Sequence, residues 1–483
     1  MLEDIIRDRR KKLERINASG VSAYPIETER TGAISGILAL FGKADFEKKK
    51  VSAAGRAITL RDQGGVIFAD LRDSTGEIQV ILRKQDLGDF DFWQANLDRG
   101  DFISATGNLI VTNRGTKSVA AKKVTMLSKS LRPLPTEHFG LEDTELRLRK
   151  RYLDLIMDPE LKKTFEKKNI FWQTFRSELT AQGFVEVELP VLEAIPGGAE
   201  AEPFITHHNA LDTDFYLRIS LELPLKKLLV GGFDAVFEIG RIFRNEGIDK
   251  EHLQDYTQME FYWAYRDYND GMRLVHDMFQ KAIENVTGGL KTVYAGQKID
   301  WSGEWPSVDY VEIFEKENDL NPVSATVEEL FGRARALKLD IDKNMGKGRL
   351  IDLIYKKTVR PKLIQPCFLI DPPVEIEPLA KRSDKKPGQV ERYQVLAAGT
   401  ELCKGFSELN DPIDQRARFE DQMKLREAGD KEAQMLDEDF LEALEYGMPP
   451  ATGLGVSERL FAVIMDKPVR ETVFFPLMKQ KND

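Results

Sequence analysis

Residues 51–130 contain five short segments with the residue pattern of β-strands, and they constrain the fold more than any other part of the chain. The segments are VSAAGRAITL, GVIFADLRD, GEIQVIL, DFISATGNLIVT and SVAAKKVTML, separated by turn signals such as DSTG and TNRG. Strands this short and this closely spaced favour a small barrel closed on itself, because closure removes exposed sheet edges. We therefore predict a compact β-barrel in this region.

The predicted barrel has the strand number of an OB-fold, which binds oligonucleotides on one face. Phe68 and Gln79 would lie on adjacent strands. There an aromatic ring can stack on a base and an amide can read a base edge. The alternative is that Phe68 belongs to the apolar core of the barrel, and the sequence leaves both interpretations open.

The chain of 483 residues is longer than a single hydrophobic core normally supports. SLRPLP, residues 130–135, interrupts both helix and strand patterns and marks a domain boundary. We expect an N-terminal helical extension over residues 1–50, the OB-fold domain over 51–135 and a larger domain over 136–483.

Charge, cysteine content and hydrophobicity exclude several classes of protein. The formal charge of −10 argues against a protein that coats nucleic acid non-specifically. Cys367 and Cys403 have no CxxC spacing, so a disulfide framework or structural zinc is not indicated, and we expect a cytoplasmic protein. No apolar run is long enough to cross a membrane. The basic run at residues 7–15 suits either an RNA-facing helix or a solvated amphipathic helix.

The larger domain is predicted to be α+β with a largely antiparallel sheet. VFEIGRIF, YTQMEFYWAY, GTELCKGFSEL and a segment around YLRIS have strand patterns. No βαβ alternation with a glycine-rich phosphate loop occurs, which argues against a doubly wound fold. Residues of about 285–365 are charged and helical in pattern, and we interpret them as an insertion.

An amphipathic helix followed by the strand-like FVEVELP predicts a subunit interface. Gly183 ends the helix, whose apolar stripe consists of Leu161, Phe165, Trp172, Phe175 and Leu179. Ile170 and Phe171 widen the apolar face beyond what one sheet would cover. We therefore predict a symmetric homodimer.

The stretch FEIGRIFRNEG places an arginine on each face of an apolar strand. Arg244, at the strand end, suits a polyphosphate, although a salt bridge to Glu246 is the alternative. Arg459 falls in the first turn of a helix that Ser457 is predicted to cap, where the macrodipole disfavours a cation. An anionic or π-faced ligand would account for Arg459.

Carboxylates form the other group of candidates. Glu401 and Glu408 near a phosphate site suggest Mg²⁺, which takes one or two carboxylates together with phosphate oxygens. Glu222 and Glu260, with Tyr262 on the same face as Glu260, would form an acidic pocket for an amine. Exposed acids on an acidic protein are the alternative. No nucleophile triad is present, so we expect catalysis by positioning and charge stabilisation.

Together these motifs resemble the bacterial-type class II lysyl-tRNA synthetases over nearly the whole chain. The segments that carry the resemblance are PGGAEAEPFITHHNALD, YLRISLELPLKKLLVGGFDAVFEIGRIFRNEG, KGFSELNDP and EYGMPP with GLGVSERL and FFPLM. FRNEG resembles motif 2, the segment around Arg459 resembles motif 3, and the helix with FVEVELP resembles motif 1. The resemblance implies ATP-dependent ligation of L-lysine to tRNA(Lys) through lysyl-adenylate, with Mg²⁺ and with release of AMP and pyrophosphate.

The resemblance also implies roles for single residues. Arg244 would hold the α-phosphate and the substrate carboxylate, and Arg459 would pack on adenine and reach the γ-phosphate. The implied ATP contacts are Arg244, Glu246, His252, Tyr256, Glu401 and Arg459. The implied lysine contacts are Gly198, Glu222, Glu260, Tyr262, Phe406 and Glu408, with Glu408 at the ε-ammonium. The implied anticodon contacts are Arg56, Phe68 and Gln79, and the implied metal ligands are Glu401 and Glu408.

Arg241 matches no catalytic position, and we interpret it as a structural partner for a neighbouring acid. Several positions depart from the family pattern. Glu202 and Glu251 stand where arginines are usual, Lys404 replaces an asparagine of the lysine site, Gln394 replaces a metal-ligand glutamate, and Lys123 replaces a glutamate of the barrel.

Three other functions remain as alternatives. Aspartyl- and asparaginyl-tRNA synthetases share the barrel and motif 2. Their pockets need cations for an acidic side chain, whereas the segment GFSELND supplies the carboxylate Glu408. Lys404, a cation near that segment, favours these two synthetases as the alternative. A lysyltransferase that modifies a protein would lack the barrel. A non-catalytic RNA-binding protein with this fold would be expected to lose Arg244, Arg459 and Glu408.

Overall fold

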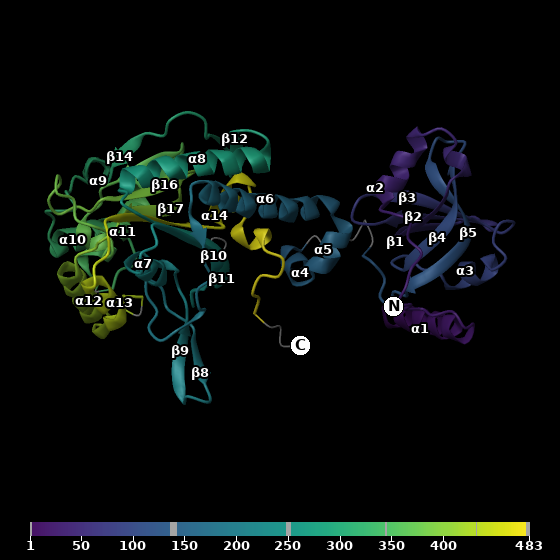
Figure 1. Cartoon of the computed structure of the whole chain (residues 1–483), viewed down its shortest axis with the longest axis horizontal. Helices are drawn as coiled ribbons and strands as arrows, with labels where there is room; N and C mark the ends of the chain where they lie inside the picture. Colours follow the sequence, from purple (N-terminus) through teal and green to yellow (C-terminus); the bar gives the residue numbers. More distant parts are fainter. Residues whose placement is uncertain (1, 136–142, 248–252, 343–344, 431, 480–483) are drawn as a thin grey trace. The chain divides into compact units, whose positions relative to one another are not determined.

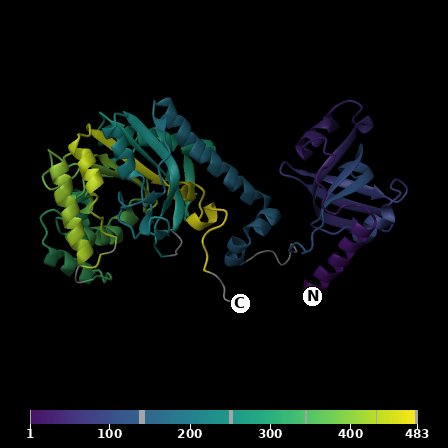
Figure 2. The same ribbon diagram turned by 60° about the horizontal axis from the view of Figure 1, so that its bottom comes forward.

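The computed structural model describes residues 2–135, 143–247, 253–342, 345–430 and 432–479. The chain forms two compact units, Met1–Glu142 and Asp143–Asp483. Both are drawn in Figure 1 and, from a second direction, in Figure 2. No helix in these described ranges is both long enough and apolar enough to span a membrane.

The first unit is built on a closed five-stranded barrel, which confirms all five predicted strands. Its strands run in the order β1-β2-β3-β5-β4. Their bounds are β1 (Lys50–Asp62), β2 (Val66–Arg72), β3 (Glu77–Arg83), β4 (Phe102–Val111) and β5 (Lys117–Ser128). Alternate side chains such as Ala69, Leu71 and Val80 fill the interior, as expected from the two-residue period of a strand.

The N-terminal segment packs on this barrel. It contains α1 (Leu2–Ala18), α2 (Ile34–Ala39), η1 (Leu40–Gly42) and η2 (Phe46–Lys48), and α3 (Phe90–Asn96) lies between β3 and β4. From the basic run of α1, Arg9 donates to the carbonyl of Arg99 at 3.0 Å, and Lys12 lies 2.8 Å from Asp98. Arg15 donates to Asn96 at 3.0 Å. Part of the basic run therefore docks the helix instead of facing solvent.

The second unit contains an eight-stranded sheet, in the order β14-β15-β16-β17-β18-β11-β10-β6. The strands are β14 (Ser307–Asp309), β15 (Cys367–Ile370), β16 (Arg392–Ala397), β17 (Thr400–Ser407), β18 (Ala451–Ser457), β11 (Asp255–Ala264), β10 (Ala235–Phe243) and β6 (Val185–Glu186). Only the outermost pairs, β14 with β15 and β6 with β10, are parallel. This arrangement confirms the predicted α+β class with a largely antiparallel sheet.

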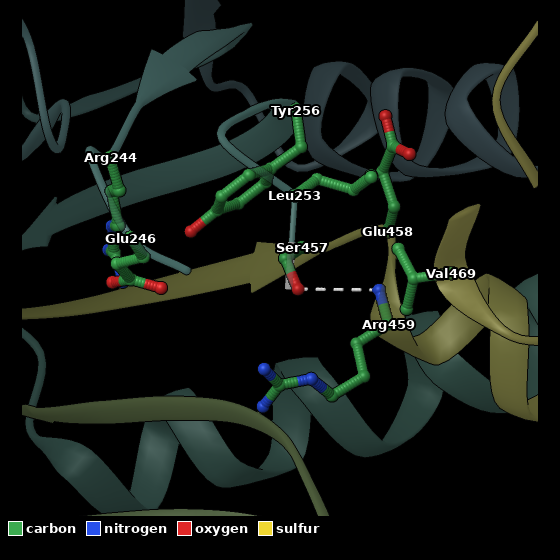
Figure 3. A pocket seen from close by; sticks show the side chains of 8 residues that line it. All are labelled: Arg244, Glu246, Leu253, Tyr256, Ser457, Glu458, Arg459 and Val469. Atoms are coloured by element: carbon green, nitrogen blue, oxygen red, sulfur yellow. Dashed lines mark hydrogen bonds between the residues drawn. The ribbon is translucent and has the colours of Figure 1, made fainter. Parts of the chain in front are cut away.

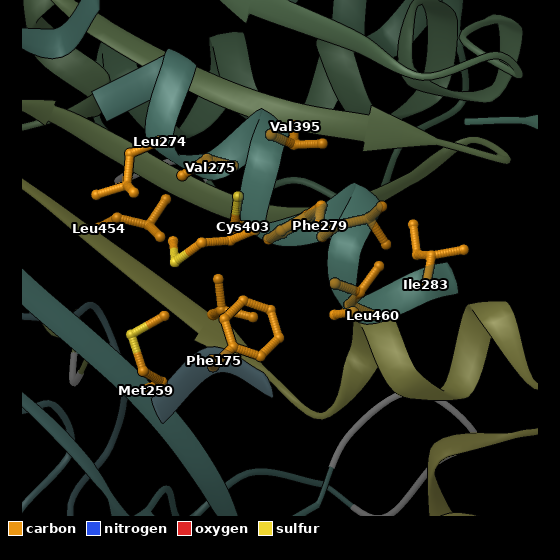
Figure 4. Packing of buried hydrophobic residues seen from close by; sticks show 14 of the residues in the cluster. Phe175, Met259, Leu274, Val275, Phe279, Ile283, Val395, Cys403, Leu454 and Leu460 are labelled. Carbon is orange, nitrogen blue, oxygen red and sulfur yellow. The ribbon is translucent and has the colours of Figure 1, made fainter. Parts of the chain in front are cut away.

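The two faces of this sheet carry different helices. On one face α6 (Pro159–Ala181) and α8 (Tyr268–Thr287) lie against each other (Figure 1). Phe175 of α6, Phe279 of α8, Met259 of β11 and Leu454 of β18 meet there in one apolar cluster (Figure 4). The other face packs on α7 (Glu222–Val230), α12 (Pro412–Glu427) and α13 (Glu438–Glu445). Tyr262 and Phe406, two of the predicted lysine contacts, lie on this second face.

The remaining elements surround the sheet. They are α4 (Thr144–Arg149), α5 (Arg151–Met157), β7 (Leu192–Glu193), β8 (Ile205–His208), β9 (Thr213–Leu217), β12 (Lys291–Tyr294), β13 (Gln297–Asp300), α9 (Tyr310–Asn318), α10 (Val327–Ala336), α11 (Lys347–Thr358), η4 (Arg360–Lys362), η5 (Val374–Ile376), α14 (Arg459–Ile464) and η6 (Val469–Thr472). The segment 285–365 is thus only partly helical, since β12 and β13 form a hairpin and β14 joins the main sheet.

Three local expectations were wrong. YLRIS does not enter the main sheet, because β9 ends at Leu217 and pairs only with β7 and β8. FVEVELP contributes only two strand residues, since beyond Val187 the Leu189 amide donates to the side-chain carboxylate of Glu238 on β10, at 3.0 Å, and not to a backbone carbonyl. Phe171 is fully buried within its own chain, so only Ile170 of that pair is exposed on α6.

Candidate active site

The two arginines at the end of β10 have separate surroundings. Arg241 is half exposed and forms a salt bridge with Asp255 of the neighbouring strand. Its guanidinium also lies 3.8 Å from the carboxylate of Glu458, so the interpretation of Arg241 as a structural partner for an acid is confirmed. Arg244 follows the last strand residue, and its Nε donates to the carbonyl of Ile219 at 3.3 Å.

Four of the predicted ATP contacts line one pocket: Arg244, Glu246, Tyr256 and Arg459. Figure 3 shows their side chains around a common space. The guanidinium carbon of Arg244 lies 5.8 Å from the centre of the Tyr256 ring, and burial raises the pKa of that phenol, so it stays protonated. His252, also predicted here, and Glu251 lie outside the described residues.

Arg459 is the first residue of α14. Glu458 holds the cap position, one residue later than predicted, although the Ser457 hydroxyl still accepts from the Arg459 amide at 3.3 Å (Figure 3). The guanidinium donates to the carbonyl of Glu401 at 3.3 Å, while its buried Nε has no hydrogen-bond partner among the residues described. A buried donor left unpaired costs free energy, so it fits a site that receives an anionic ligand.

Glu401 and Glu408, the predicted metal ligands, stand at opposite ends of β17, with Glu401 near its start and Glu408 directly after its last residue. Seven residues of extended chain separate them, a span on the order of 20 Å. Gln394 donates to the Glu401 carboxylate at 2.6 Å. Within the described ranges no cluster of three or more acidic, histidine or cysteine side chains could hold a metal by itself. Glu401 therefore stands as a single carboxylate beside Arg459.

The predicted lysine contacts converge on the α7 face of the sheet. Gly198 has φ +84°, and a Cβ there would lie 2.8 Å from Cβ of Glu222, so a side chain would be strained and crowded. Gly453 of β18 is crowded in the same way, because a Cβ there would lie 2.3 Å from the Tyr262 ring and 2.4 Å from Glu408 Oε1, so a side chain would collide with both. The sequence analysis missed Gly453; the alternating glycines of ATGLGVS were its signal.

Glu260 is fixed by four donors in this pocket. They are the Ser220 hydroxyl at 2.7 Å, the Leu221 amide at 2.9 Å, the Gln258 amide group at 2.5 Å and the Tyr262 hydroxyl at 3.1 Å. Such a set holds a buried carboxylate in one orientation. Because Ile219 contacts Arg244 and the adjoining Ser220 contacts Glu260, one short segment links the pocket of Arg244 and Arg459 to the buried carboxylates.

Lys226 is a buried residue of this pocket that the sequence analysis missed. Its ammonium lies 2.6 Å from Glu222 and also pairs with Glu408. Burial opposes the charged form of Lys226, but the two carboxylates outweigh it and raise its pKa. The available signal was a lysine four residues after Glu222 in the otherwise apolar helix ELPLKKLLV.

Lys404, the residue that departs from the asparagine of the family, is neutralised locally. Its ammonium lies 2.9 Å from Glu377, which also pairs with Arg392 at 3.2 Å. Although burial opposes ionisation of Glu377, Lys404 and Arg392 outweigh it and lower the pKa of this carboxyl. The positive charge of Lys404 is therefore balanced beside the carboxylate pocket.

The residues predicted to contact nucleic acid lie on the barrel strands. Phe68 and Gln79 lie half-buried on the adjacent strands β2 and β3, and Phe68 alternates with inward residues, so it is not a core side chain. Gln79 accepts from the Ser118 hydroxyl at 3.1 Å. Arg56 lies over the Phe102 ring at 4.2 Å. Lys123, the other departure, is paired with Glu29 of the N-terminal segment at 2.8 Å.

Comparisons with known proteins agree with this geometry. Residues 143–479 match the family described as tRNA synthetases class II (D, K and N), and residues 51–127 match the OB-fold nucleic acid binding domain. A lysine–tRNA ligase of Moorella thermoacetica is 44% identical over 485 residues, which cover 99% of each chain. The lysine–tRNA ligase of Pelotomaculum thermopropionicum is 43% identical, and the alignment covers 99% of this chain and 96% of that protein. The one of a Roseiflexus species is also 43% identical, and the alignment covers 100% of both chains.

The chain belongs to the lysine–tRNA ligases, within the class II tRNA synthetases.

Membership in this class explains why the site residues come from distant segments. Arg244 follows β10, Glu260 and Tyr262 lie on β11, Arg459 begins α14 and Glu222 begins α7, so segments far apart in the chain meet at the site. The structure explains how the chain accommodates Lys404 in place of the asparagine of the family pattern, because Glu377 forms an ion pair with it.

Replacing Glu377 with Gln should destabilise the second unit by about 3–5 kcal/mol at neutral pH, because Lys404 and Arg392 would be left buried without a counter-charge. The low pKa of Glu377 means that its contribution is present above the carboxyl pKa of the unfolded chain and is lost as pH falls. The difference between wild type and variant should therefore shrink below about pH 4. Urea denaturation at several pH values measures this difference.

Glu375→Gln is the matched control, since Glu375 pairs with the partly exposed Lys347 at 2.8 Å. It should cost no more than about 1 kcal/mol. Equal stability of the Glu377→Gln variant and wild type at neutral pH would show that Glu377 does not neutralise its two cations.

Proposed function

We propose that this enzyme joins L-lysine to tRNA(Lys) in an ATP-dependent reaction through a lysyl-adenylate intermediate, with release of pyrophosphate and AMP. The observation that carries the proposal is that a pocket lined by Arg244 and Arg459 is linked through Ile219 and Ser220 to a buried cluster of three carboxylates, Glu222, Glu260 and Glu408. The first suits a nucleoside triphosphate and the second suits an amino acid with two ammonium groups.

In the first step, a carboxylate oxygen of lysine attacks the α-phosphorus of ATP, and the bond to the bridging oxygen breaks as pyrophosphate leaves. Arg244 stabilises the charge that develops on the α-phosphate and orients the lysine carboxylate. Tyr256 offers a ring face to adenine, and Arg459 binds the opposite side of the nucleotide. In the second step, the terminal hydroxyl of tRNA attacks the lysyl carbonyl carbon, and AMP leaves.

The carboxylate pocket provides the selection for lysine. We assign the α-ammonium to Glu260 and Glu222 next to Gly198, and the ε-ammonium to Glu408 between Tyr262 and Phe406. An uncharged side chain would leave Glu408 buried and unpaired, which disfavours analogues of lysine. Lys404 had favoured aspartate as the substrate, and its pairing with Glu377 removes that support.

Glu401 is the residue that would hold Mg²⁺. It lies beside Arg459, where the triphosphate is assigned, and a single carboxylate with phosphate oxygens is a usual magnesium environment. When bound, the ion would supply positive charge to the phosphate oxygens. Glu401, held by Gln394, orients one carboxylate oxygen for this purpose.

The barrel is assigned to the anticodon of tRNA. Phe68 offers a partly exposed ring for stacking, and Gln79 offers an amide on the neighbouring strand. Arg56, stacked on Phe102, adds a cation to this unit. We place the enzyme in the cytoplasm, where tRNA charging takes place and where free buried thiols such as Cys367 and Cys403 persist.

We also propose a homodimer. Ile170 on α6, Val185 on the edge strand β6 of the main sheet, Val191 just before β7 and Leu192 on β7 are exposed apolar residues, and α6 contacts β6. Two copies related by a twofold axis would cover this face.

Arg244→Ala tests the mechanism by ATP–pyrophosphate exchange. With wild type, we expect stimulation by lysine and none by aspartate or asparagine. The variant should lose about 100-fold or more of the exchange rate, as expected when a transition-state charge partner is removed. Arg241→Ala is the matched control: it removes an arginine three residues away that pairs with Asp255, and should keep the rate within about threefold. Lack of stimulation by lysine, or full activity of Arg244→Ala, would contradict the proposal.

Sedimentation tests the dimer. Wild type should have twice the mass of one chain, and the double variant Ile170→Asp, Val185→Asp should sediment as a single chain because buried charges disfavour the interface. Val293→Asp, an equally exposed apolar residue on β12, should leave the mass unchanged. Wild type with the mass of one chain at micromolar concentration would rule the dimer out.

A further inference from the structure

Glu458 and Arg459 are neighbouring residues of opposite charge, and both line the pocket assigned to ATP. Their side chains point in opposite directions from the start of α14 (Figure 3). Arg459 donates to the carbonyl of Glu401 at 3.3 Å, and its buried Nε has no hydrogen-bond partner among the described residues. The carboxylate of the adjoining residue therefore leaves this cation to another partner.

A buried ion pair accounts for the direction of the Glu458 side chain. This side chain is only 1% exposed, and its Oε2 lies 2.7 Å from the ammonium of Lys168 on α6. Oε1 accepts from the backbone amide of Thr257 at 3.0 Å. A carboxylate buried this deeply is stable only with such partners. Lys168 and Thr257 therefore hold the charge of Glu458 toward α6.

Lys168 is itself fixed in place. Only 15% of its side chain is exposed, and its ammonium also donates to the carbonyl of Thr472, at the end of η6, at 2.9 Å. Arg241 is a second cation near Glu458, at 3.8 Å, but it is half exposed and pairs with Asp255. Lys168 is therefore the buried counter-charge of Glu458.

Loss of Lys168 would leave the charge of Glu458 without its buried partner beside the pocket assigned to a triphosphate. An uncompensated carboxylate there would repel phosphate oxygens, and it would attract the guanidinium of Arg459. Both effects weaken the binding of a nucleotide. Neither acts on the carboxylates that are assigned to lysine.

We propose that Lys168 is a positioning residue for the nucleotide pocket: it holds and neutralises the carboxylate of Glu458, so that Arg459 stays available to the anionic part of ATP. This inference rests on the proposed function, because it assumes that the pocket of Arg244 and Arg459 binds ATP. Lys168 touches neither the substrate nor the reacting atoms. It acts on ATP binding through Glu458.

A purely structural role for the ion pair is the alternative. In that case the loss of Lys168 loosens the contact between α6 and α14, and the further loss of the Glu458 charge does not repair it. If Lys168 instead acts by controlling the charge of Glu458, removing that charge as well restores nucleotide binding. A double variant therefore separates the two interpretations.

The experiment measures the KM for ATP and the KM for lysine in pyrophosphate exchange by full-length variants. Lys168→Met removes the ammonium and keeps an unbranched side chain. The double variant adds Glu458→Gln, whose side-chain oxygen can still accept from the Thr257 amide. Lys163→Met is the matched control on the same helix, because Lys163 is exposed and pairs with Glu160 at 2.7 Å.

For Lys168→Met we expect the KM for ATP to rise about tenfold or more, the effect of losing one charge-assisted hydrogen bond from Arg459. The KM for lysine should stay within about threefold of wild type, which also shows that the variant is folded. The double variant should bring the KM for ATP back to within about threefold of wild type, because neutral side chains can replace a buried ion pair at little cost. Lys163→Met should behave as wild type.

Three results would overturn the inference: an unchanged KM for ATP in Lys168→Met, an equal rise in the KM for lysine, or a double variant that keeps the raised KM for ATP. If Lys168→Met does not fold, the double variant decides alone, because it contains no unpaired charge. A double variant with the wild-type KM for ATP then supports the inference, and one that has a raised KM or does not fold overturns it. Failure of the proposed function is a separate outcome, because wild type itself would then show no exchange with lysine.

Discussion

The burial of opposite charges on one face of the sheet is the constraint on which the rest of the site depends. Glu222, Glu260 and Glu408 are all removed from solvent, and charged groups in such surroundings are stable only when paired or fully hydrogen-bonded. Lys226 forms ion pairs with Glu222 and Glu408, and four hydrogen-bond donors contact Glu260. A pocket built this way is arranged to receive further positive charge.

The two faces of the sheet have different roles in forming this pocket. The face under α6 and α8 is apolar and holds the strands in register (Figure 4). The opposite face presents alternate residues of the same strands, so Phe261 of β11 packs inward toward α6 and α8 while Glu260 and Tyr262 point to the site. The arginines of the nucleotide pocket stand where β10 ends and α14 begins (Figure 3).

Local patterns predicted much of this arrangement, because the strands of the barrel and the positions of Arg244 and Arg459 follow from short-range chemistry. The contacts that complete the site are tertiary and have no local signature. Glu377 lies 27 positions before Lys404 in the chain, and the local sequence around either residue does not predict their ion pair. Glu401 and Glu408 look close in sequence, whereas the extended backbone of β17 separates them, and their assignment as metal ligands stays a prediction. The helix cap lies at Glu458, one residue after the predicted Ser457, and the buried side chain of Glu458 pairs with Lys168.

Equilibrium binding of L-lysine and of norleucine to the wild-type enzyme, measured by isothermal titration calorimetry, tests the central claim most directly. Norleucine has the same carbon chain and lacks the ε-ammonium. If the buried carboxylate of Glu408 selects the substrate by charge, norleucine should bind at least about 100-fold more weakly, because Glu408 Oε1 would stay unpaired. Comparable affinities for the two amino acids would contradict the account, since the pocket would then recognise shape and not charge.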